Sequence, residues 1–106
     1  MSFYSQQFSA SFSPQTIYGA LDPWAVFIAG QVRIDSAGLL ASLLLEYDWV
    51  DSNGAQSKQI TVALGTVGIS PPFTFPVFSA GNQYLTMKGT VTGSATFTVQ
   101  YGVVYF

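Results

Sequence analysis

The amino-acid sequence predicts an all-β domain, an antiparallel β-sandwich or jelly roll of about seven strands. Apolar and polar residues alternate with a period of two along most of the chain, which is typical of strands with one buried face. Clusters of Gly, Pro, Asn, Asp and Ser separate the alternating segments, as in sandwiches and barrels. The 106 residues also match the usual size of one domain and leave no room for a second.

The N-terminal segment has a composition of its own, rich in Ser and Gln with phenylalanines at intervals. Phe3, Phe8 and Phe12 would lie in water if this segment were free, and exposed rings favour a surface that covers them. We therefore expect residues 1–15 to form an extended arm or a first strand that docks on a sheet, either of its own chain or of a neighbour. Residues 16–106 then form the single sandwich domain.

The first long strand is expected to follow Pro23, since proline is tolerated where a strand opens. Alternation gives this strand an apolar face made of Trp24, Val26, Ile28, Val32 and Ile34. Gly30 lies in the middle of the strand, where a glycine indicates a bulge or the close approach of another backbone. The next residues, 36–38, predict a turn.

Residues 39–50 fit a helical spacing and a strand alternation equally well. The Asn53-Gly54 dipeptide that follows favours the strand, because it is the strongest short hairpin signal between alternating segments. With these two residues as the loop, apolar residues face each other along the hairpin, and Lys58 can lie on the Trp49 ring at the open end. The expected pairs are Trp49–Lys58, Tyr47–Ile60, Leu45–Val62 and Leu43–Leu64.

Residues 59–87 carry no charge, but they do not predict a membrane span. Pro71, Pro72 and Pro76, together with many Ser and Thr residues, interrupt any helix long enough to cross a bilayer. The same prolines confine Phe73–Phe78 to a short segment at the edge of a sheet, where a missing backbone donor is tolerated.

The last two alternating segments, residues 83–92 and 96–105, predict a second hairpin. A three-residue loop, Gly93-Ser94-Ala95, brings apolar residues of the two segments opposite each other, which a two-residue loop would not. The expected pairs are Val91–Phe97, Gly89–Val99, Met87–Tyr101 and Leu85–Val103. Val104 and Phe106 remain on the opposite face, where we expect a neighbouring subunit.

The composition excludes several classes of function. Because the chain has neither cysteine nor histidine, it cannot form disulfides, thiolate metal sites or a histidine-dependent catalytic site. Only 8% of the residues are charged, against about 25% in ordinary domains. The three cations, Arg33, Lys58 and Lys88, form no cluster, so the basic patch that nucleic acid requires is missing.

The acidic residues predict neither catalysis nor metal binding. Glu46 and Asp48 share the polar face of one strand, as in a glycosidase pair, but a solvated face or an ion pair with Lys58 is the simpler interpretation. Residues 48–53 resemble part of a calcium loop without its full ligand spacing. No Ser–Lys arrangement such as S-x-x-K and no phosphate-binding glycine loop occurs. We therefore expect a protein without enzymatic activity, catalytic residues, metal or cofactor.

Aromatic and terminal apolar residues are the candidates for binding. The phenylalanines of residues 73–78 cannot all be buried at once, because alternation separates Phe78 from the other two. Tyr47 and Trp49 form a possible platform for a sugar ring, although the predicted register favours a core position for Trp49. The expected interface residues are Phe3, Tyr4, Phe8, Phe12, Phe73, Phe75, Phe78, Val104 and Phe106.

Residues 89–105, GTVTGSATFTVQYGVVY, form a terminal segment punctuated by Thr and Gly in a chain poor in charge and without Cys or His. In these features the chain resembles small all-β structural proteins of tailed bacteriophage virions. Such proteins decorate capsids, form head–tail parts or make up fibre domains. The resemblance implies symmetric assembly of copies, with arms that cross between subunits.

We therefore expect a non-enzymatic structural protein of the virion, one that forms homo-oligomers and binds other proteins of a larger shell. Surfaces with little charge suit such assemblies, because burying unpaired charge opposes close packing. Neither nucleic acid nor a membrane is expected as a partner. The alternative is a carbohydrate- or receptor-binding module of a fibre or adhesin at the extracellular surface, with a glycan as the ligand.

Overall fold

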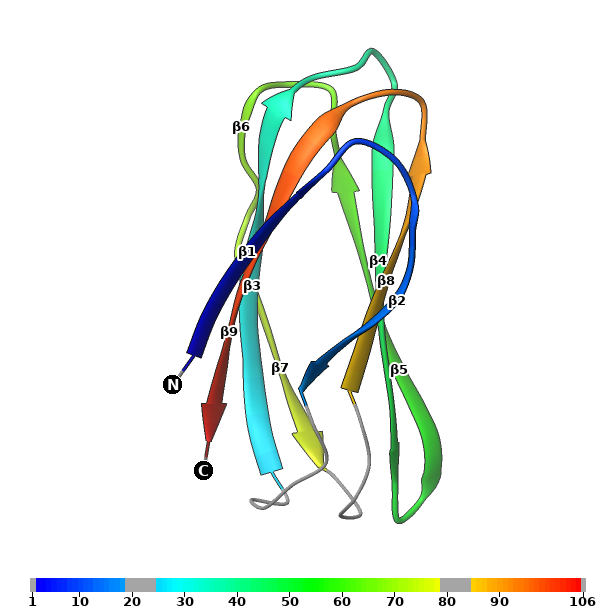
Figure 1. The fold of residues 1–106 in the computed structure, drawn as a ribbon, viewed down its shortest axis with the longest axis vertical. Coiled ribbons are helices and arrows are strands. Elements are labelled where there is room, and N and C mark those ends of the chain that lie inside the picture. Colours follow the sequence, from blue (N-terminus) through cyan, green and yellow to red (C-terminus); the bar gives the residue numbers. More distant parts are fainter. Residues whose placement is uncertain (1, 19–24, 79–84, 106) are drawn as a thin grey trace.

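Nine strands make up the described part of the molecule, a computed structural model that covers residues 2–18, 25–78 and 85–105 (Figure 1). The strands are β1 (Ser2–Phe8), β2 (Phe12–Tyr18), β3 (Ala25–Ser36), β4 (Ser42–Asp51), β5 (Gly54–Ala63), β6 (Gly68–Ile69), β7 (Phe73–Phe78), β8 (Leu85–Thr92) and β9 (Thr96–Tyr105). The predicted all-β class is confirmed. Nine strands replace about seven because the N-terminal segment forms both β1 and β2, and because the short β6 precedes the prolines. No helix in the described ranges is long and apolar enough to cross a membrane.

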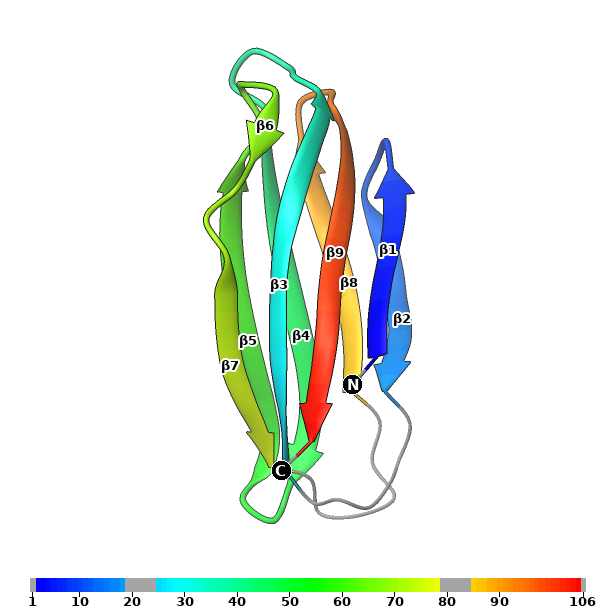
Figure 2. The ribbon, with the colours of Figure 1, turned by 90° about the vertical axis from the view of Figure 1, so that its left-hand side faces the viewer.

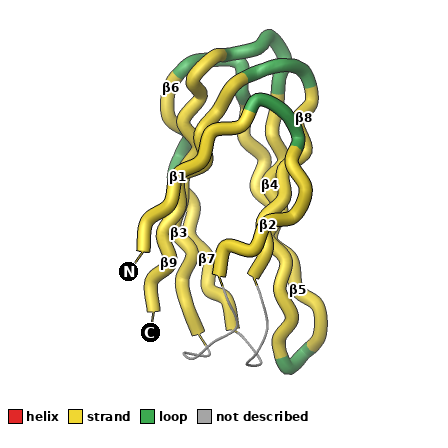
Figure 3. The backbone as a smooth tube through the Cα atoms, viewed as in Figure 1, coloured by secondary structure: helices red, strands yellow, loops and turns green. Residues whose placement is uncertain are grey.

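The strands form two antiparallel sheets (Figure 2). Sheet A has the order β1-β9-β3, and the far side of β3 pairs with β6 near one end and with β7 along the rest of its length. Sheet B has the order β2-β8-β4-β5. Figure 3 shows that most of the described loops lie at the two ends of the sandwich.

The pairing follows the order of a rolled β-ribbon. β4 pairs with β5, β3 with β7, β2 with β8 and β1 with β9, so each pair encloses the previous one around the turn at residues 52–53. Successive pairs of this ribbon fall in alternate sheets. This arrangement is a jelly roll, the second of the two predicted architectures.

The predicted hairpin of the last two segments is wrong. β8 lies in sheet B between β2 and β4, whereas β9 lies in sheet A between β1 and β3. The connection that begins at Gly93, whose φ is 82°, carries the chain from one sheet to the other. Alternation failed to reveal this crossing, because apolar side chains on both strands face the core whether the strands pair or lie in opposite sheets.

The predicted β4–β5 hairpin exists, but its register is shifted by two residues. Asp51 pairs with Gly54, so the loop is Ser52-Asn53 rather than Asn53-Gly54. The Asp51 carboxylate accepts a hydrogen bond from the Asn53 backbone N–H at 2.7 Å, and Gly54 adopts a φ of 105°. A shift of two residues keeps every side chain on the same face, so Leu43 and Leu45 are buried in either register.

The core lies between the two sheets and uses the faces that alternation predicted. Its fully buried side chains come from four strands and from Leu64 just after β5, with Ile28 and Val32 on β3 and Phe97 and Val99 on β9 among them. Gly30 marks a close approach rather than a bulge, since a Cβ there would lie 2.8 Å from both the Gln100 carbonyl oxygen and the Phe73 ring. Trp24, which was expected on the same face, lies outside the described residues.

The N-terminal segment forms a corner of the chain's own sandwich. β1 pairs with β9 in sheet A, and β2 pairs with β8 in sheet B, so the predicted boundary between residues 15 and 16 falls inside β2. The rings of Phe8 and Phe12 stack where the chain crosses between the sheets, with centroids 3.8 Å apart. Gly89 leaves the space that the Phe12 ring occupies, because a Cβ there would overlap this ring.

Candidate functional site

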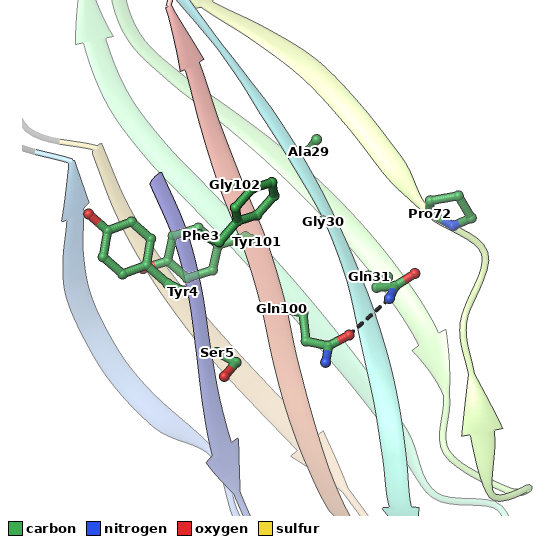
Figure 4. A pocket seen from close by; sticks show the side chains of 10 residues that line it. All are labelled: Phe3, Tyr4, Ser5, Ala29, Gly30, Gln31, Pro72, Gln100, Tyr101 and Gly102. Carbon is green, nitrogen blue, oxygen red and sulfur yellow. Dashed lines mark hydrogen bonds between the residues drawn. The ribbon is translucent and has the colours of Figure 1, made fainter. Parts of the chain in front are cut away.

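A groove lies on the outer face of sheet A and has a volume of about 470 Å³ (Figure 4). β1, β9, β3 and the segment before β7 contribute its walls and floor. We call it the sheet A groove, and its lining consists of Phe3, Tyr4, Ser5, Ala29, Gly30, Gln31, Pro72, Gln100, Tyr101 and Gly102.

Two rows of side chains cross the groove from strand to strand. In the first, Phe3 of β1 lies opposite Gly102 of β9, which lies opposite Ala29 of β3. This row is apolar, and its two small residues lower the floor beside the Phe3 ring, which is 76% exposed.

The second row is polar but uncharged. Ser5 lies opposite Gln100, and Gln100 lies opposite Gln31. The Gln31 Nε2 donates a hydrogen bond to the Gln100 Oε1 at 2.9 Å, which fixes both amides on the floor (Figure 4). The groove therefore offers neutral hydrogen-bonding groups beside an apolar surface.

A carboxylate network follows the polar row along the same face. The Asp35 carboxylate accepts hydrogen bonds from Thr98 Oγ1 and Arg33 Nε, each at 2.6 Å, and from Gln7 Nε2 at 3.1 Å. The hydrogen bond from Thr98 lowers the pKa of Asp35 most, Arg33 and Gln7 lower it further, and the pKa falls to about 2. The network ties β1, β9 and β3 together and leaves this carboxylate engaged within the protein.

On the outer face of sheet B, the acidic pair found in the sequence has a different cation from the one expected. Glu46 lies opposite Lys88 of β8, whose Nζ is 3.1 Å from its Oε2, so Lys88 and not Lys58 forms the ion pair. A hydrogen bond from Gln59 lowers the pKa of Glu46, and partial burial raises the pKa of Asp48. Sequence reasoning missed Lys88 because the pairing of β4 with β8 is long-range.

A second surface lies at the end of the sandwich where β3 joins β4 and β5 leads to β6 (Figure 1). Leu39 and Leu40 are 92% and 88% exposed there, and Val67 and Ile69 are also exposed. We call these four residues the apolar end. The strand prediction for residues 39–50 was wrong at its start, since β4 begins at Ser42 and Leu39 lies in the loop.

The loop that presents the two leucines is held by two neighbouring loops. Gly38 N–H donates a hydrogen bond to the Leu64 carbonyl at 3.0 Å, and Leu64 N–H donates one to the Ala41 carbonyl at 2.9 Å. A Cβ at Gly38 would overlap the Ser94 carbonyl, so the β8–β9 connection packs directly against the loop. Leu40 itself has a φ of 59°, in the left-handed region that side chains other than glycine rarely adopt.

The predicted interface residues divide by exposure. Phe3, Tyr4 and Phe78 are exposed, whereas Phe8, Phe12 and Phe73 are partly buried against the core. Phe75 was expected at an interface but is a core residue, only 5% exposed, because β7 turns it toward sheet B. Val104 lies in β9, where its backbone pairs with that of Phe27, and Phe106 lies outside the described residues.

The predicted aromatic platform is absent from the surface. Tyr47 is fully buried, and its ring contacts Phe73 and Phe75 at centroid distances of 6.1 and 5.0 Å. Trp49 is partly buried and stacks on Phe75 at 6.0 Å. Both side chains point into the sandwich, so Tyr47 cannot present its ring to a sugar.

Sequence reasoning named Phe3 and Tyr4 of the sheet A groove as interface residues but missed the rest of both surfaces. Alternation does place Gln31 and Gln100 on outer faces, but it does not show that β3 and β9 are neighbours. The Leu39-Leu40 pair had one available signal, the preceding Ser36–Gly38 turn, which an assignment of residues 39–41 to the strand disregards.

No protein-family model and no curated protein matches the chain. Solved structures share its fold. A protein of Bacillus endospore appendages, described as disulfide-linked pili, has a TM-score of 0.51 and 16% identity over 98% of this chain and 84% of that one. The infectious bursal disease virus VP2 subviral particle has a TM-score of 0.50 and 14% identity, over 98% of this chain and 32% of that one.

A third similar structure is the enzymatically active domain of tailspike protein 4 from bacteriophage CBA120, with a TM-score of 0.52 and 13% identity. It covers 94% of this chain, which spans only 14% of the tailspike chain. At these identities the likeness establishes the all-β sandwich fold alone.

Proposed function

We propose that this chain is a non-enzymatic structural protein of a virion or another extracellular assembly, and that it oligomerises and binds a larger protein shell through its apolar end. The observation that carries the proposal is the exposure of Leu39 and Leu40 on a held loop with Leu40 at positive φ. A left-handed leucine costs about 1–2 kcal/mol relative to an ordinary conformation. No packing in the described core offsets this cost, since both side chains point into solvent.

Burial of these side chains by a partner would recover more than the strain. Covering one exposed leucine contributes about 1.5–3 kcal/mol. Desolvation would cost little, because the chain carries no charge between Asp35 and Glu46 or in residues 59–87. The two loops that pack against the leucine loop also reduce the entropy lost on binding.

Two further observations support the setting. A pilus protein, a virus particle and a phage tailspike domain share the fold, although likeness of fold does not define function. The low charge and the absence of His and Cys match the resemblance to phage structural proteins. Capsid decoration in a tailed bacteriophage virion is the specific form of the proposal.

The proposal is tested by a double variant, Leu39→Ser with Leu40→Gly. Glycine adopts the positive φ at position 40 without strain, so we expect this variant to be as stable in urea as the wild type, or more stable by about 1 kcal/mol. It should nevertheless fail to form the large assemblies that we expect light scattering to detect for the wild-type chain. The control is Val50→Ser, which removes an exposed apolar side chain near the β4–β5 turn, at the other end of the sandwich (Figure 1). Equal assembly by the double variant and the wild type would contradict the proposal.

The sheet A groove favours a second candidate function, the binding of a neutral glycan. Its polar row supplies amide and hydroxyl groups, and the exposed Phe3 ring beside it can stack on the apolar face of a sugar. Calorimetric titration with a panel of neutral oligosaccharides tests this function. Gln100→Ala and Phe3→Ala should each weaken a binding that Val50→Ser leaves unchanged, and a panel with no binding member would exclude the function.

A further inference from the structure

The two sheets present four outer edges, and three of these carry features that block pairing with another strand. β7 contains Pro76, which lacks a backbone donor, and β6 is only two residues long. β2 contains Pro14 and two shifts of register against β8. β5 carries Lys58 opposite the buried Tyr47, on the inner face of its edge, where a charge opposes the docking of a strand.

The outer edge of β1 carries none of these features. All seven of its residues pair with β9 in unbroken register, and none of them is proline or charged. Within the described chain its other side has no strand partner, so it presents a row of backbone N–H and C=O groups to solvent. The chemistry that fits such an edge is the edge of another strand.

We infer that β1 of one copy pairs antiparallel with β1 of a second copy, about a twofold axis through Ser5. Ser5 then lies opposite Ser5 of the second copy, Phe3 opposite Gln7 and Tyr4 opposite Gln6. This register overlaps all seven residues and keeps the outer faces of both copies on the same side of one continuous sheet. The inference rests on the proposed structural function, for which it supplies the first symmetric contact.

The exposure of Tyr4 is a second observation that points to the same partner. Tyr4 stacks on Tyr101 at 5.1 Å and shares the inner parity of β1 with Gln6 and Phe8. It is nevertheless 48% exposed. In the inferred pair, Gln6 of the second copy would lie directly beside Tyr4 and cover part of this ring.

The experiment uses opposite charges at the twofold axis. Ser5 is exposed on the outer face, so Ser5→Lys and Ser5→Asp should both fold. Each variant alone places two like charges directly opposite, about 5 Å apart between Cβ atoms, and we expect its dimer dissociation constant to rise by about fivefold. An equimolar mixture of the two variants should restore the dimer, because lysine then faces aspartate.

Sedimentation equilibrium of the full chain over a wide concentration range measures the dimer. The control is Thr74→Lys, which adds the same charge to β7, the opposite edge of sheet A, and should leave the dimer unchanged. A wild-type chain that stays monomeric overturns the inference. Two weakened variants that the mixture does not restore also overturn it, because the Ser5 residues of the two copies would then not lie opposite each other.

The outcome is separable from that of the proposed function. The Leu39→Ser, Leu40→Gly variant should lose the larger assemblies and keep the β1 dimer. If the dimer fails while the larger assemblies remain, the β1 inference is wrong and the role of the apolar end stands.

Discussion

Replacement of Tyr47 by phenylalanine should stabilise this protein, although most core substitutions destabilise. The Tyr47 side chain is fully buried, and its hydroxyl has no hydrogen-bond partner in the described structure. Burial raises the pKa of Tyr47 well above its ordinary value of 10.0, so the group is a neutral hydroxyl over the whole physiological range. The unfolded chain, by contrast, lets water satisfy this hydroxyl.

The expected change in the free energy of unfolding is the sum of two opposing contributions. An unsatisfied buried hydroxyl costs about 1–3 kcal/mol, and phenylalanine removes this cost. Deletion of the oxygen leaves a void of about 10 Å³, which costs only about 0.2 kcal/mol. The free energy of unfolding should therefore rise by about 1 kcal/mol, which corresponds to a rise in Tm of roughly 4 °C or more for a domain of this size.

Urea unfolding monitored by tryptophan fluorescence tests the prediction, with an unchanged m-value as evidence that the unfolded state is the same. The control is Tyr101→Phe, whose side chain is only partly buried, and its stability should stay within about 0.5 kcal/mol of the wild type. A loss of stability in Tyr47→Phe would refute the reasoning, since it would show that the hydroxyl has a partner in the folded protein.

Two further predictions concern the corner and the carboxylate network. Gly89→Ala should cost about 1–3 kcal/mol of stability, because a Cβ there would overlap the Phe12 ring and lie 2.7 Å from its Cζ. Gly65→Ala, whose nearest neighbour would be 3.9 Å away, should be close to neutral in the same urea titration. The pKa of Asp35 is lowered from 3.8 to about 2 on folding, so its contribution to stability is present above pH 3.8 and is lost as the pH falls toward 2. Between these two pH values, the Tm of Asp35→Asn should depend less on pH than the Tm of the wild type. Equal slopes of Tm against pH would contradict this assignment.

Alternation predicted the parts of the fold that depend on one strand at a time. It placed Ile28, Leu43 and Phe97 in the core, and each is buried. The turn residues also predicted a hairpin between β4 and β5, although its loop lies one residue earlier than expected. These features are local, because the face of a residue depends on its parity and the turn on a few neighbouring residues.

Pairing between distant strands was not predictable in the same way. A strand with a buried face has the same sequence pattern whether its neighbour is next in the chain or far away, and β8 and β9 show the consequence. The sheet A groove depends on such pairing, since Gln31 and Gln100 meet only because β3 lies beside β9. Phe75 and Tyr47 were assigned to binding surfaces for a related reason. Parity shows which face of its strand a side chain lies on, but not that another sheet covers this face.

The rolled ribbon also changes which part of the chain can hold an assembly together. The sequence predicted an extended N-terminal arm or a first strand docked on a sheet, and ordering such an arm on a partner would cost conformational entropy for every residue. In the structure this segment is already ordered as β1 and β2, so it can offer a preformed strand edge instead of an arm. The apolar end is likewise ordered in advance, because Gly38 and Gly93 let three loops pack closely under Leu39 and Leu40. Both surfaces therefore avoid most of the entropy cost of binding. This matters in a chain with so few charges, because it can form few ion pairs with a partner.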